Sequence, residues 1–220
     1  MRTVMTLVSL VSGASRGLGF ATASALAGPD HHIIAVARTV GGLEELDDVI
    51  LSKGGTATLV PLDITDESGL QTLGKSIFDR WGHLDSFIHC AAHAAPLAPV
   101  GHIDTKDLDR VWAVNARATQ RFITMLDPLL KNAKHGQAVH CHDPHLEAKF
   151  SGAYGSSKQA ALSVVESWKA ESVQTGPDIQ VFEPKPMPTA LRARFFPGED
   201  RAKLTPTKTE AARLISQLKS

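Results

Sequence analysis

The sequence lacks an excess of charge, long apolar runs and low-complexity segments. Lys and Arg number 23 and balance 23 Asp and Glu, so there is no global field that would gather nucleic acid or an anionic membrane. No run approaches the roughly 18 apolar residues that a membrane-spanning helix requires. No charge-dense or Pro/Ser-rich stretch divides the 220 residues, of which 43% are hydrophobic. We therefore expect one domain over residues 1–220 and a small-molecule partner, not nucleic acid or a membrane.

Cysteine is also scarce, because Cys90 and Cys141 are the only two in the chain. Two cysteines provide no disulfide framework, and both fall in segments with the character of buried strands. This suits a reducing compartment, so the expected location is the cytoplasm.

Short β-rich runs alternate with helical stretches over almost the whole chain. The predicted strands are 7–12, 33–37, 58–61, 86–90, 138–142 and 179–182. The predicted helices are 17–27, 42–52, 67–80, 107–132, 152–174 and 207–218. This alternation is typical of an α/β fold in which helices cover both faces of a parallel sheet.

A glycine-rich loop follows the first predicted strand and opens the first helix. It contains Gly13, Ser15, Arg16, Gly17, Leu18 and Gly19. Glycines permit a tight turn and a close backbone approach, and free N–H groups at a helix start attract a pyrophosphate. Three glycines alone would be weak support, but their place between a strand and a helix favours a nucleotide site.

The second predicted strand ends near Arg38, without the Asp or Glu that would bind the adenosine ribose of NAD. Arg16 in the glycine loop can reach the same region. Two guanidinium groups suit a 2′-phosphate, although each could simply be a solvated surface arginine. Together, with no acid present, they favour NADP(H).

An apolar stripe on the predicted helix 107–132 is interrupted by one amide. Its positions are Leu108, Val111, Asn115, Ala118, Phe122, Met125 and Leu129, which advance in steps of three and four. A buried amide needs partners, so Asn115 either bonds to a neighbouring strand or belongs to a site. Spacing alone favours the structural bond.

Tyr154 is the only tyrosine of the chain, and Lys158 follows it by one helical turn on the same face as Leu162 and Val165. A neighbouring ammonium favours the phenolate and lowers a tyrosine pKa, which makes the side chain usable in proton transfer. The Tyr-x-x-x-Lys spacing is common by itself, and its place on an inward helical stripe strengthens the catalytic interpretation.

Together these motifs resemble those of the short-chain dehydrogenase/reductase family, from about residue 5 to the end of the chain. The family pattern Thr-Gly-x-x-x-Gly-x-Gly is matched by Ser12 to Gly19, with Ser in place of Thr. The resemblance implies that Asp63, followed by Ile64, contacts the adenine amino group. It also implies that Pro184 and Thr189 contact the nicotinamide carboxamide.

The resemblance assigns the catalytic group as well. Tyr154 would be the proton donor, Lys158 would also bind the nicotinamide ribose, and Asn115 would hold a water in a proton relay. This implication reverses the structural interpretation of Asn115 that spacing alone favours.

The chain departs from the family at several of these positions. The family sequence Asn-Asn-Ala-Gly after the fourth strand is here His89-Cys90-Ala91-Ala92, of which Cys90, Ala91 and Ala92 are expected to line the cofactor site. Pro184 is followed by Lys185 where the family has glycine. We expect cofactor binding to survive these changes.

The position of the family's catalytic serine holds no serine. Counting forward from Gly136 by strand register puts Asp143 there, whereas counting back from Tyr154 gives Cys141. A short loop deletion reconciles the two counts. Asp143 is preferred, because Val139 and Cys141 have the apolar character of buried strand positions. If Asp143 projects into the site as a carboxylate, it opposes Lys158, because an anion near Tyr154 disfavours the phenolate.

Several potential metal ligands cluster at the ends of two predicted strands: His89, Cys90, His93, His140, Cys141, His142 and His145. Alternate strand residues point to opposite faces, so these side chains cannot converge, and none has metal-ligand spacing. We expect no metal, and we interpret the histidines as a polar crevice wall.

These observations predict a Rossmann-type, doubly wound parallel sheet of six strands with helices on both faces. The predicted function is NADP(H)-dependent interconversion of a carbonyl and an alcohol on a small molecule. The alternative is an NADP(H)-binding sensor or interaction protein with little turnover, which the missing serine favours.

Segment 190–203 is expected to cover the substrate as a lid. A homodimer through helices 107–132 and 152–174 is expected, because no seventh strand is visible for the family's tetramer.

Overall fold

Six parallel strands form one sheet in the order β3-β2-β1-β4-β5-β6. The structure, a computed structural model, describes residues 6–143 and 149–218. The strands are β1 (Leu7–Ser12), β2 (His31–Ala37), β3 (Thr56–Pro61), β4 (Ser86–His89), β5 (Gln137–Cys141) and β6 (Asp178–Phe182). This topology confirms the predicted Rossmann-type sheet.

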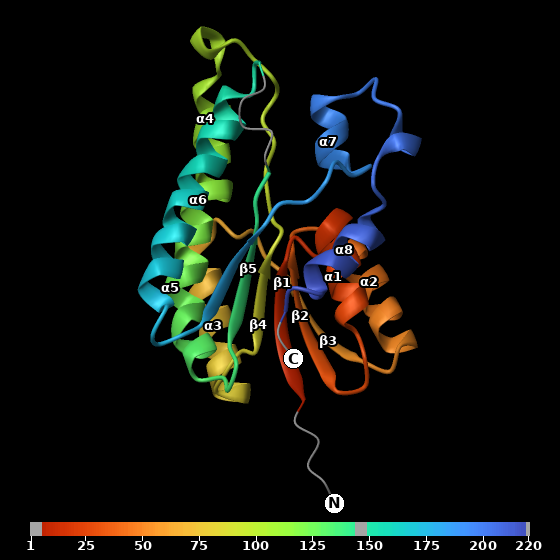
Figure 1. Cartoon of the computed structure of the whole chain (residues 1–220), viewed down its shortest axis with the longest axis vertical. Helices are drawn as coiled ribbons and strands as arrows, with labels where there is room; N and C mark the ends of the chain where they lie inside the picture. The colour runs from red at the N-terminus through yellow and green to blue at the C-terminus, as the bar shows by residue number, and fades with distance from the viewer. Residues whose placement is uncertain (1–5, 144–148, 219–220) are drawn as a thin grey trace, which may run out of the picture.

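Helices cover both faces of the sheet (Figure 1). One face carries α1 (Gly17–Leu26), α2 (Val40–Ser52) and α8 (Thr207–Ile215). The other carries α3 (Glu67–Trp81), α4 (Thr105–Val111), α5 (Ala118–Lys131) and α6 (Gly152–Ser172). The short α7 (Ala190–Phe195) lies beyond the sheet, and single 3-10 turns occupy Val100–His102 and Arg201–Lys203.

Two hydrophobic cores result, one on each face of the sheet. Val8 and Leu10 of β1 pack into the core under α3, α5 and α6, whereas Val11 packs into the core under α1, α2 and α8. A strand whose alternate residues enter two cores is buried on both faces, which explains the nearly continuous apolar runs in the sequence.

Two strands begin two residues earlier than predicted, β2 at His31 and β3 at Thr56. The first residues of both strands are polar, so the apolar pattern in the sequence did not indicate that the strands begin there. The two ring nitrogens of His32 lie 2.7 Å from Thr56 Oγ1 and 2.9 Å from Thr58 Oγ1, so this histidine bonds across the strand pair.

The predicted helix 107–132 is correct in extent but not in regularity. It consists of α4, a π-helical turn at Trp112–Arg117, and α5. Such wide turns occur mostly as single insertions in α-helices, often at functional sites. Asn115 lies inside this turn and is buried, with 1% of its surface exposed.

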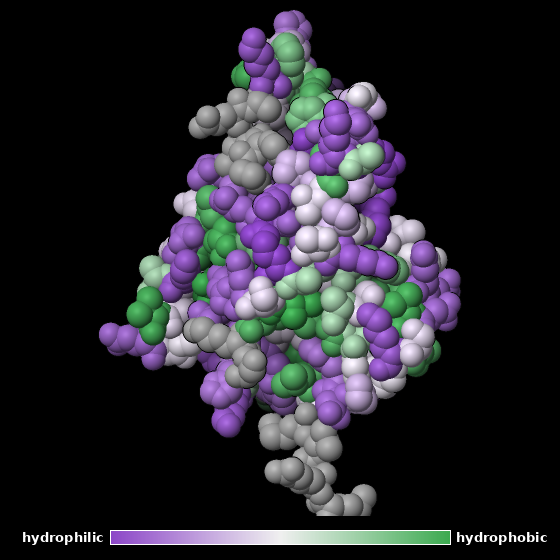
Figure 2. Space-filling model, turned by 45° about the vertical axis from the view of Figure 1, so that its right-hand side comes forward, coloured by the Kyte–Doolittle hydropathy of each residue, from purple (hydrophilic) through white to green (hydrophobic). Residues whose placement is uncertain are grey.

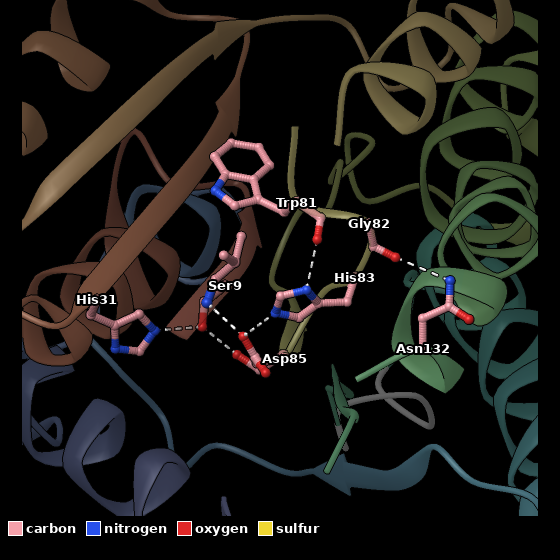
Figure 3. Close-up of polar contacts among 9 residues, drawn as sticks. Ser9, His31, Trp81, Gly82, His83, Asp85 and Asn132 are labelled. Carbon is pink, nitrogen blue, oxygen red and sulfur yellow. Dashed lines mark hydrogen bonds and ion pairs between the residues drawn. The ribbon is translucent and has the colours of Figure 1, made fainter. Parts of the chain in front are cut away.

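Polar side chains hold the amino-terminal edge of the sheet together (Figure 3). The Asp85 carboxylate accepts the Val8 N–H at 2.8 Å and lies 3.4 Å from His83 Nε2. Ser9 Oγ lies 2.6 Å from His31 Nε2 and 2.5 Å from Ser86 Oγ. These contacts tie β1 to both neighbouring strands, so that the three strands end in step at the opposite edge.

Among the residues that the structure describes, no helix has both the length and the apolar composition to cross a bilayer. The face shown in Figure 2 mixes hydrophilic and hydrophobic side chains and presents no continuous apolar band.

Candidate active site

A cleft of about 750 Å³ opens at the carboxyl ends of the central strands. The strand order reverses between β1 and β4, which is where open α/β sheets bind their ligands. All residues predicted to bind the cofactor line this cleft: Gly13, Ser15, Arg16, Gly17, Leu18, Gly19, Arg38, Asp63, Ile64, Cys90, Ala91, Ala92, Tyr154, Lys158, Pro184 and Thr189. Motifs spread over the whole sequence therefore converge at one place.

The glycine loop is packed tightly against the segment that follows β4. Gly13 has φ +72°, and a Cβ there would lie 2.8 Å from the Ala91 backbone nitrogen. A Cβ at Gly19 would overlap the Gly13 carbonyl oxygen. No side chain caps the start of α1 at Arg16, so its first N–H groups are available to a ligand. This cradle fits a dinucleotide pyrophosphate.

One end of the cleft gathers arginines around Asp63. Arg110 Nη2 donates to Asp63 Oδ2 at 2.7 Å, and Arg38 Nη1 lies 3.9 Å from the same oxygen. Burial raises the pKa of Asp63, but hydrogen bonds from Thr65 and Arg110 outweigh it and lower the pKa to about 2. Asp63 is therefore a carboxylate near neutral pH. Sequence reasoning missed Arg110, because its partner lies far away along the chain and no motif contains it.

The opposite end of the cleft holds Tyr154, Asp143 and Lys158. Tyr154 Oη donates to Asp143 Oδ2 at 2.9 Å, and Lys158 Nζ donates to the Cys141 carbonyl oxygen at 2.8 Å. Asp143, not Cys141, therefore presents its side chain to the tyrosine. This contact supports the assignment of Asp143 to the position of the family's serine.

Asp143 opposes the effect of Lys158 on the tyrosine, as the sequence predicts for a carboxylate at the serine position. Burial, followed by the charge and the hydrogen bond of Asp143, raises the pKa of Tyr154 well above its usual range. Burial also lowers the pKa of Lys158. Near neutral pH Tyr154 is thus a neutral phenol whose proton points at a carboxylate.

Asn115 braces the wall behind the tyrosine and does not line the cleft. Its Oδ1 accepts the His93 N–H at 2.8 Å, and its Nδ2 donates to the His93 carbonyl at 3.0 Å and to Ser157 Oγ at 2.9 Å. These bonds pin the segment after β4 to α6. They support the structural function that spacing alone favoured, and the water relay implied by the resemblance stays a prediction.

The crevice-wall interpretation holds for only part of the histidine cluster. His93 and His142 line the cleft, although His142 is itself buried, whereas His89 and His140 lie inside the sheet away from the cleft. Within 6–143 and 149–218, no group of three His, Cys, Asp or Glu side chains could hold a metal ion. His145 lies outside the described residues, and the absence of a metal stays a prediction.

His89 should make the fold sensitive to acid. Its ring nitrogens lie 2.6 Å from Ser12 Oγ and 3.0 Å from Thr119 Oγ1. Burial first, and the Lys158 charge second, lower its pKa from 6.5 to about 3. Because the folded pKa is depressed, this stability is complete above pH 6.5 and is lost as pH falls toward 3. We expect His89 alone to reduce the free energy of unfolding by about 2 kcal/mol between pH 7 and pH 5.

Urea denaturation at pH 7, 6 and 5 measures this effect. His89→Asn is the matched variant, since an amide can bond to both hydroxyls without titrating. Between pH 7 and pH 5, the free energy of unfolding of this variant should fall by about 2 kcal/mol less than that of the wild-type protein. An equal slope in the two proteins would contradict the assignment to His89.

Helix α7 borders the cleft on the side of Tyr154. Thr189 Oγ1 caps the helix by accepting the Arg192 N–H at 3.2 Å, and Arg192 forms two bonds to the Glu199 carboxylate, at 2.5 and 2.6 Å. Arg194 Nη1 donates to the Ala94 carbonyl at 2.9 Å. The Phe195 ring lies 4.9 Å from that of Tyr154. The cleft is lined here by Ala190, Leu191, Arg192, Arg194, Phe195 and Phe196, and the lid expected over segment 190–203 stays a prediction.

Comparisons with known proteins agree with this geometry. The family model for short chain dehydrogenase matches residues 7–200. A fatty acyl-CoA reductase from Acinetobacter baylyi is 32% identical over 133 residues, which are 60% of this chain but only 45% of that protein. An uncharacterized oxidoreductase from Listeria monocytogenes is 27% identical over 180 residues, 81% of this chain and 72% of the relative.

Solved structures show the same fold. A short chain dehydrogenase from Pseudomonas syringae has a TM-score of 0.86 at 25% identity and covers 95% of this chain and 87% of its own. A Shigella flexneri structure of a short chain dehydrogenase complexed with NADP has a TM-score of 0.84 at 24% identity. The match covers 94% of this chain and 89% of the Shigella flexneri chain. With the family model matching most of its length, this chain belongs to the short-chain dehydrogenase family.

Proposed function

We propose that this protein is an NADP(H)-dependent oxidoreductase that interconverts a carbonyl and an alcohol on a small molecule. The observation that carries the proposal is the convergence of the glycine loop, Arg16, Arg38 and the Tyr154–Lys158 pair on one cleft. A nicotinamide dinucleotide, when bound, supplies or accepts the hydride. The Shigella flexneri relative, crystallised with NADP, supports the choice of cofactor class.

The residues present fit this cofactor. The N–H groups at the start of α1 and the close approach at Gly13 would hold the pyrophosphate. Arg16 and Arg38 would bind a 2′-phosphate, and Asp63 the adenine. Lys158, Pro184 and Thr189 would hold the nicotinamide half.

Tyr154 would move the proton at its Oη atom. Because the pKa of Tyr154 is raised, the phenol form dominates near neutral pH, and this is the form that can protonate a substrate oxygen. Oxidation of an alcohol would need the phenolate as a base, which the same environment disfavours. We therefore assign to Tyr154, in its phenol form, the role of proton donor in carbonyl reduction.

A second candidate function is an NADP(H)-binding sensor or interaction protein with little turnover. The hydrogen bond from Tyr154 to Asp143 favours it, because this bond diverts the proton from the substrate. Oxidation of NADPH against a panel of aldehydes, ketones and quinones tests the choice. Tight nucleotide binding without oxidation by any compound would support the sensor and contradict the enzyme.

We predict that NADPH binds at least about tenfold more tightly than NADH, since charge-assisted hydrogen bonds to a phosphate contribute roughly 1.5 to 3 kcal/mol. Arg38→Ala should remove most of this preference by weakening NADPH binding while leaving NADH binding nearly unchanged. Titration calorimetry with both nucleotides measures the effect. Arg117→Ala, which removes an exposed arginine outside the cleft, is the matched control. Equal affinities for the two nucleotides in the wild-type protein would contradict the assignment of Arg16 and Arg38.

Cytoplasmic location and a homodimer through α4, α5 and α6 stay predictions. The substrate also stays open, and Leu191, Phe195 and Phe196 suggest an apolar wall that would accept many compounds.

A further inference from the structure

The only two cysteines of the chain lie side by side in the floor of the cleft. Cys90 directly follows β4, and Cys141 ends β5. The register pairs His89 with His140, so the two cysteines occupy the next paired positions. Their sulfur atoms are 3.4 Å apart, and both cysteines are free thiols.

The backbone geometry is compatible with a bond between them. Neighbouring strands lie about 4.8 Å apart, which falls within the range of about 4.4 to 6.8 Å found between the Cα atoms of disulfides. An S–S bond is about 2.05 Å long, so the sulfurs at 3.4 Å must approach by about 1.3 Å. Side-chain rotation can supply part of this approach, and the two strand ends must supply the rest.

We propose that Cys90 and Cys141 are an oxidation site at which a peroxide forms an intramolecular disulfide that weakens nucleotide binding. The effect on binding rests on the proposed function, whereas formation of the disulfide does not. Nothing in the family resemblance places a cysteine at either position, so the site is a property of this chain.

The chemistry needs only the two thiols and hydrogen peroxide. A thiolate attacks one peroxide oxygen, the O–O bond breaks, and hydroxide leaves and becomes water, which gives a sulfenic acid. The second thiol attacks this sulfur, the S–O bond breaks, and a second water leaves. The cysteine pair loses two electrons, which reduce the peroxide to water. Excess dithiol reductant reverses the change.

Both strand ends touch parts of the proposed cofactor site. A Cβ at Gly13 would lie 3.0 Å from the Cys90 carbonyl carbon, so the glycine loop packs closely on that backbone, and a shift of Cys90 toward Cys141 draws it away from the loop. On the other side, the Cys141 carbonyl accepts the Lys158 ammonium at 2.8 Å. Drawing the two strand ends together therefore disturbs the loop that would hold the pyrophosphate and the lysine that would hold the nicotinamide ribose.

The resting pair is poorly reactive. The hydrogen bond with Cys141 and then burial raise the pKa of the Cys90 thiol, and the Lys158 charge opposes them only in part. Oxidation should accordingly be slow. A disulfide strained between adjacent strands is, in turn, readily reduced.

The first experiment detects the bond by mass. Fully reduced protein, freed of reductant and treated with hydrogen peroxide, should lose the mass of two hydrogen atoms as a monomer, and both cysteines should then resist alkylation. Dithiothreitol should restore both. Two thiols that stay alkylatable, a dimer joined by disulfides, or a gain of oxygen atoms on the cysteines themselves would each overturn the proposal.

The second experiment measures NADPH binding by fluorescence in the reduced and peroxide-treated forms. We expect the affinity of the wild-type protein to fall at least about tenfold on oxidation and to recover on reduction. Cys90→Ala and Cys141→Ala, each compared with its own untreated form, should show no such fall, and circular dichroism checks that all forms stay folded. Equal affinities in wild-type protein that carries the disulfide would overturn the effect on binding. If reduced wild-type protein binds no NADPH, the proposed function fails, and the mass experiment still decides whether the disulfide forms.

Discussion

Replacing Tyr154 by phenylalanine should reduce single-turnover oxidation of NADPH by about a thousandfold, within the range of 10² to 10⁴ for loss of a general acid. The phenol is the group that donates its proton to the substrate oxygen in the proposed reaction. The carboxylate of Asp143 and the carbonyl of Cys141 are acceptors in the hydrogen bonds that they form there. The substitution keeps the ring and its contact with Phe195 and removes only the hydroxyl.

The measurement is stopped-flow NADPH oxidation with enzyme in excess over nucleotide, on the best carbonyl compound of the panel. Nucleotide affinity is measured separately, so that a loss of chemistry is distinguished from a loss of binding. A Tyr154→Phe rate within a few-fold of wild type would show that the proton comes from elsewhere, which would remove Tyr154 from the proposed mechanism.

Replacing Asp143 by serine should raise the same rate by about ten- to a hundredfold, equivalent to roughly 1.4 to 2.8 kcal/mol. As a carboxylate, Asp143 accepts the hydrogen bond of the tyrosine, with 2.9 Å between Tyr154 Oη and Asp143 Oδ2. The same carboxylate repels the negative charge that develops on the substrate oxygen. At about 4 Å and an effective dielectric constant near 20, a full charge pair interacts by roughly 4 kcal/mol, so the expected gain lies within the available energy. Serine can both donate and accept a hydrogen bond without the charge.

Asp143→Asn separates the effect of the charge from the effect of the side chain's shape and hydrogen bonding, because it removes the charge and keeps the shape. If charge dominates, the asparagine variant should recover most of the gain. Combining Asp143→Ser with Tyr154→Phe should return the rate to that of Tyr154→Phe alone. Unchanged or lower rates in Asp143→Ser, with nucleotide binding intact, would mean that Asp143 contributes positively to the reaction.

The fold was predictable from the sequence, because it depends on local patterns. The first strand was predicted at 7–12 and occupies Leu7–Ser12, since an apolar run bounded by a glycine loop has one plausible interpretation. The starts of β2 and β3 were missed, because histidine and threonine are polar in the sequence but bond to each other across the strand pair. The π-helical turn at Trp112–Arg117 was also missed, since periodicity tolerates an inserted residue within a long helix.

The candidate site was predictable as a set of residues but not as a set of interactions. The residues expected to bind the cofactor line one cleft, and burial together with Asp143 raises the pKa of Tyr154. Spacing along a helix shows that Lys158 lies near Tyr154. It cannot show that the Asp143 carboxylate accepts the tyrosine hydrogen bond and raises the pKa of Tyr154. Arg110 acts on Asp63 from another helix, and such a contact appears only when the chain is folded.

Helix α7 forms some contacts within its own segment and others with the opposite wall of the cleft. The second kind would have to break before a ligand could leave past the helix. The cap at Thr189 and the two bonds between Arg192 and Glu199 lie inside the segment, so they persist if it swings as one body. The bond from Arg194 to Ala94 and the ring contact of Phe195 with Tyr154 cross to the opposite wall and must break. A hydrogen bond from a charged donor contributes about 1.5 to 3 kcal/mol, which is less than the cost of unfolding the segment. If the segment acts as the lid that the sequence predicts, it could therefore release a product by swinging open while its internal bonds stay intact.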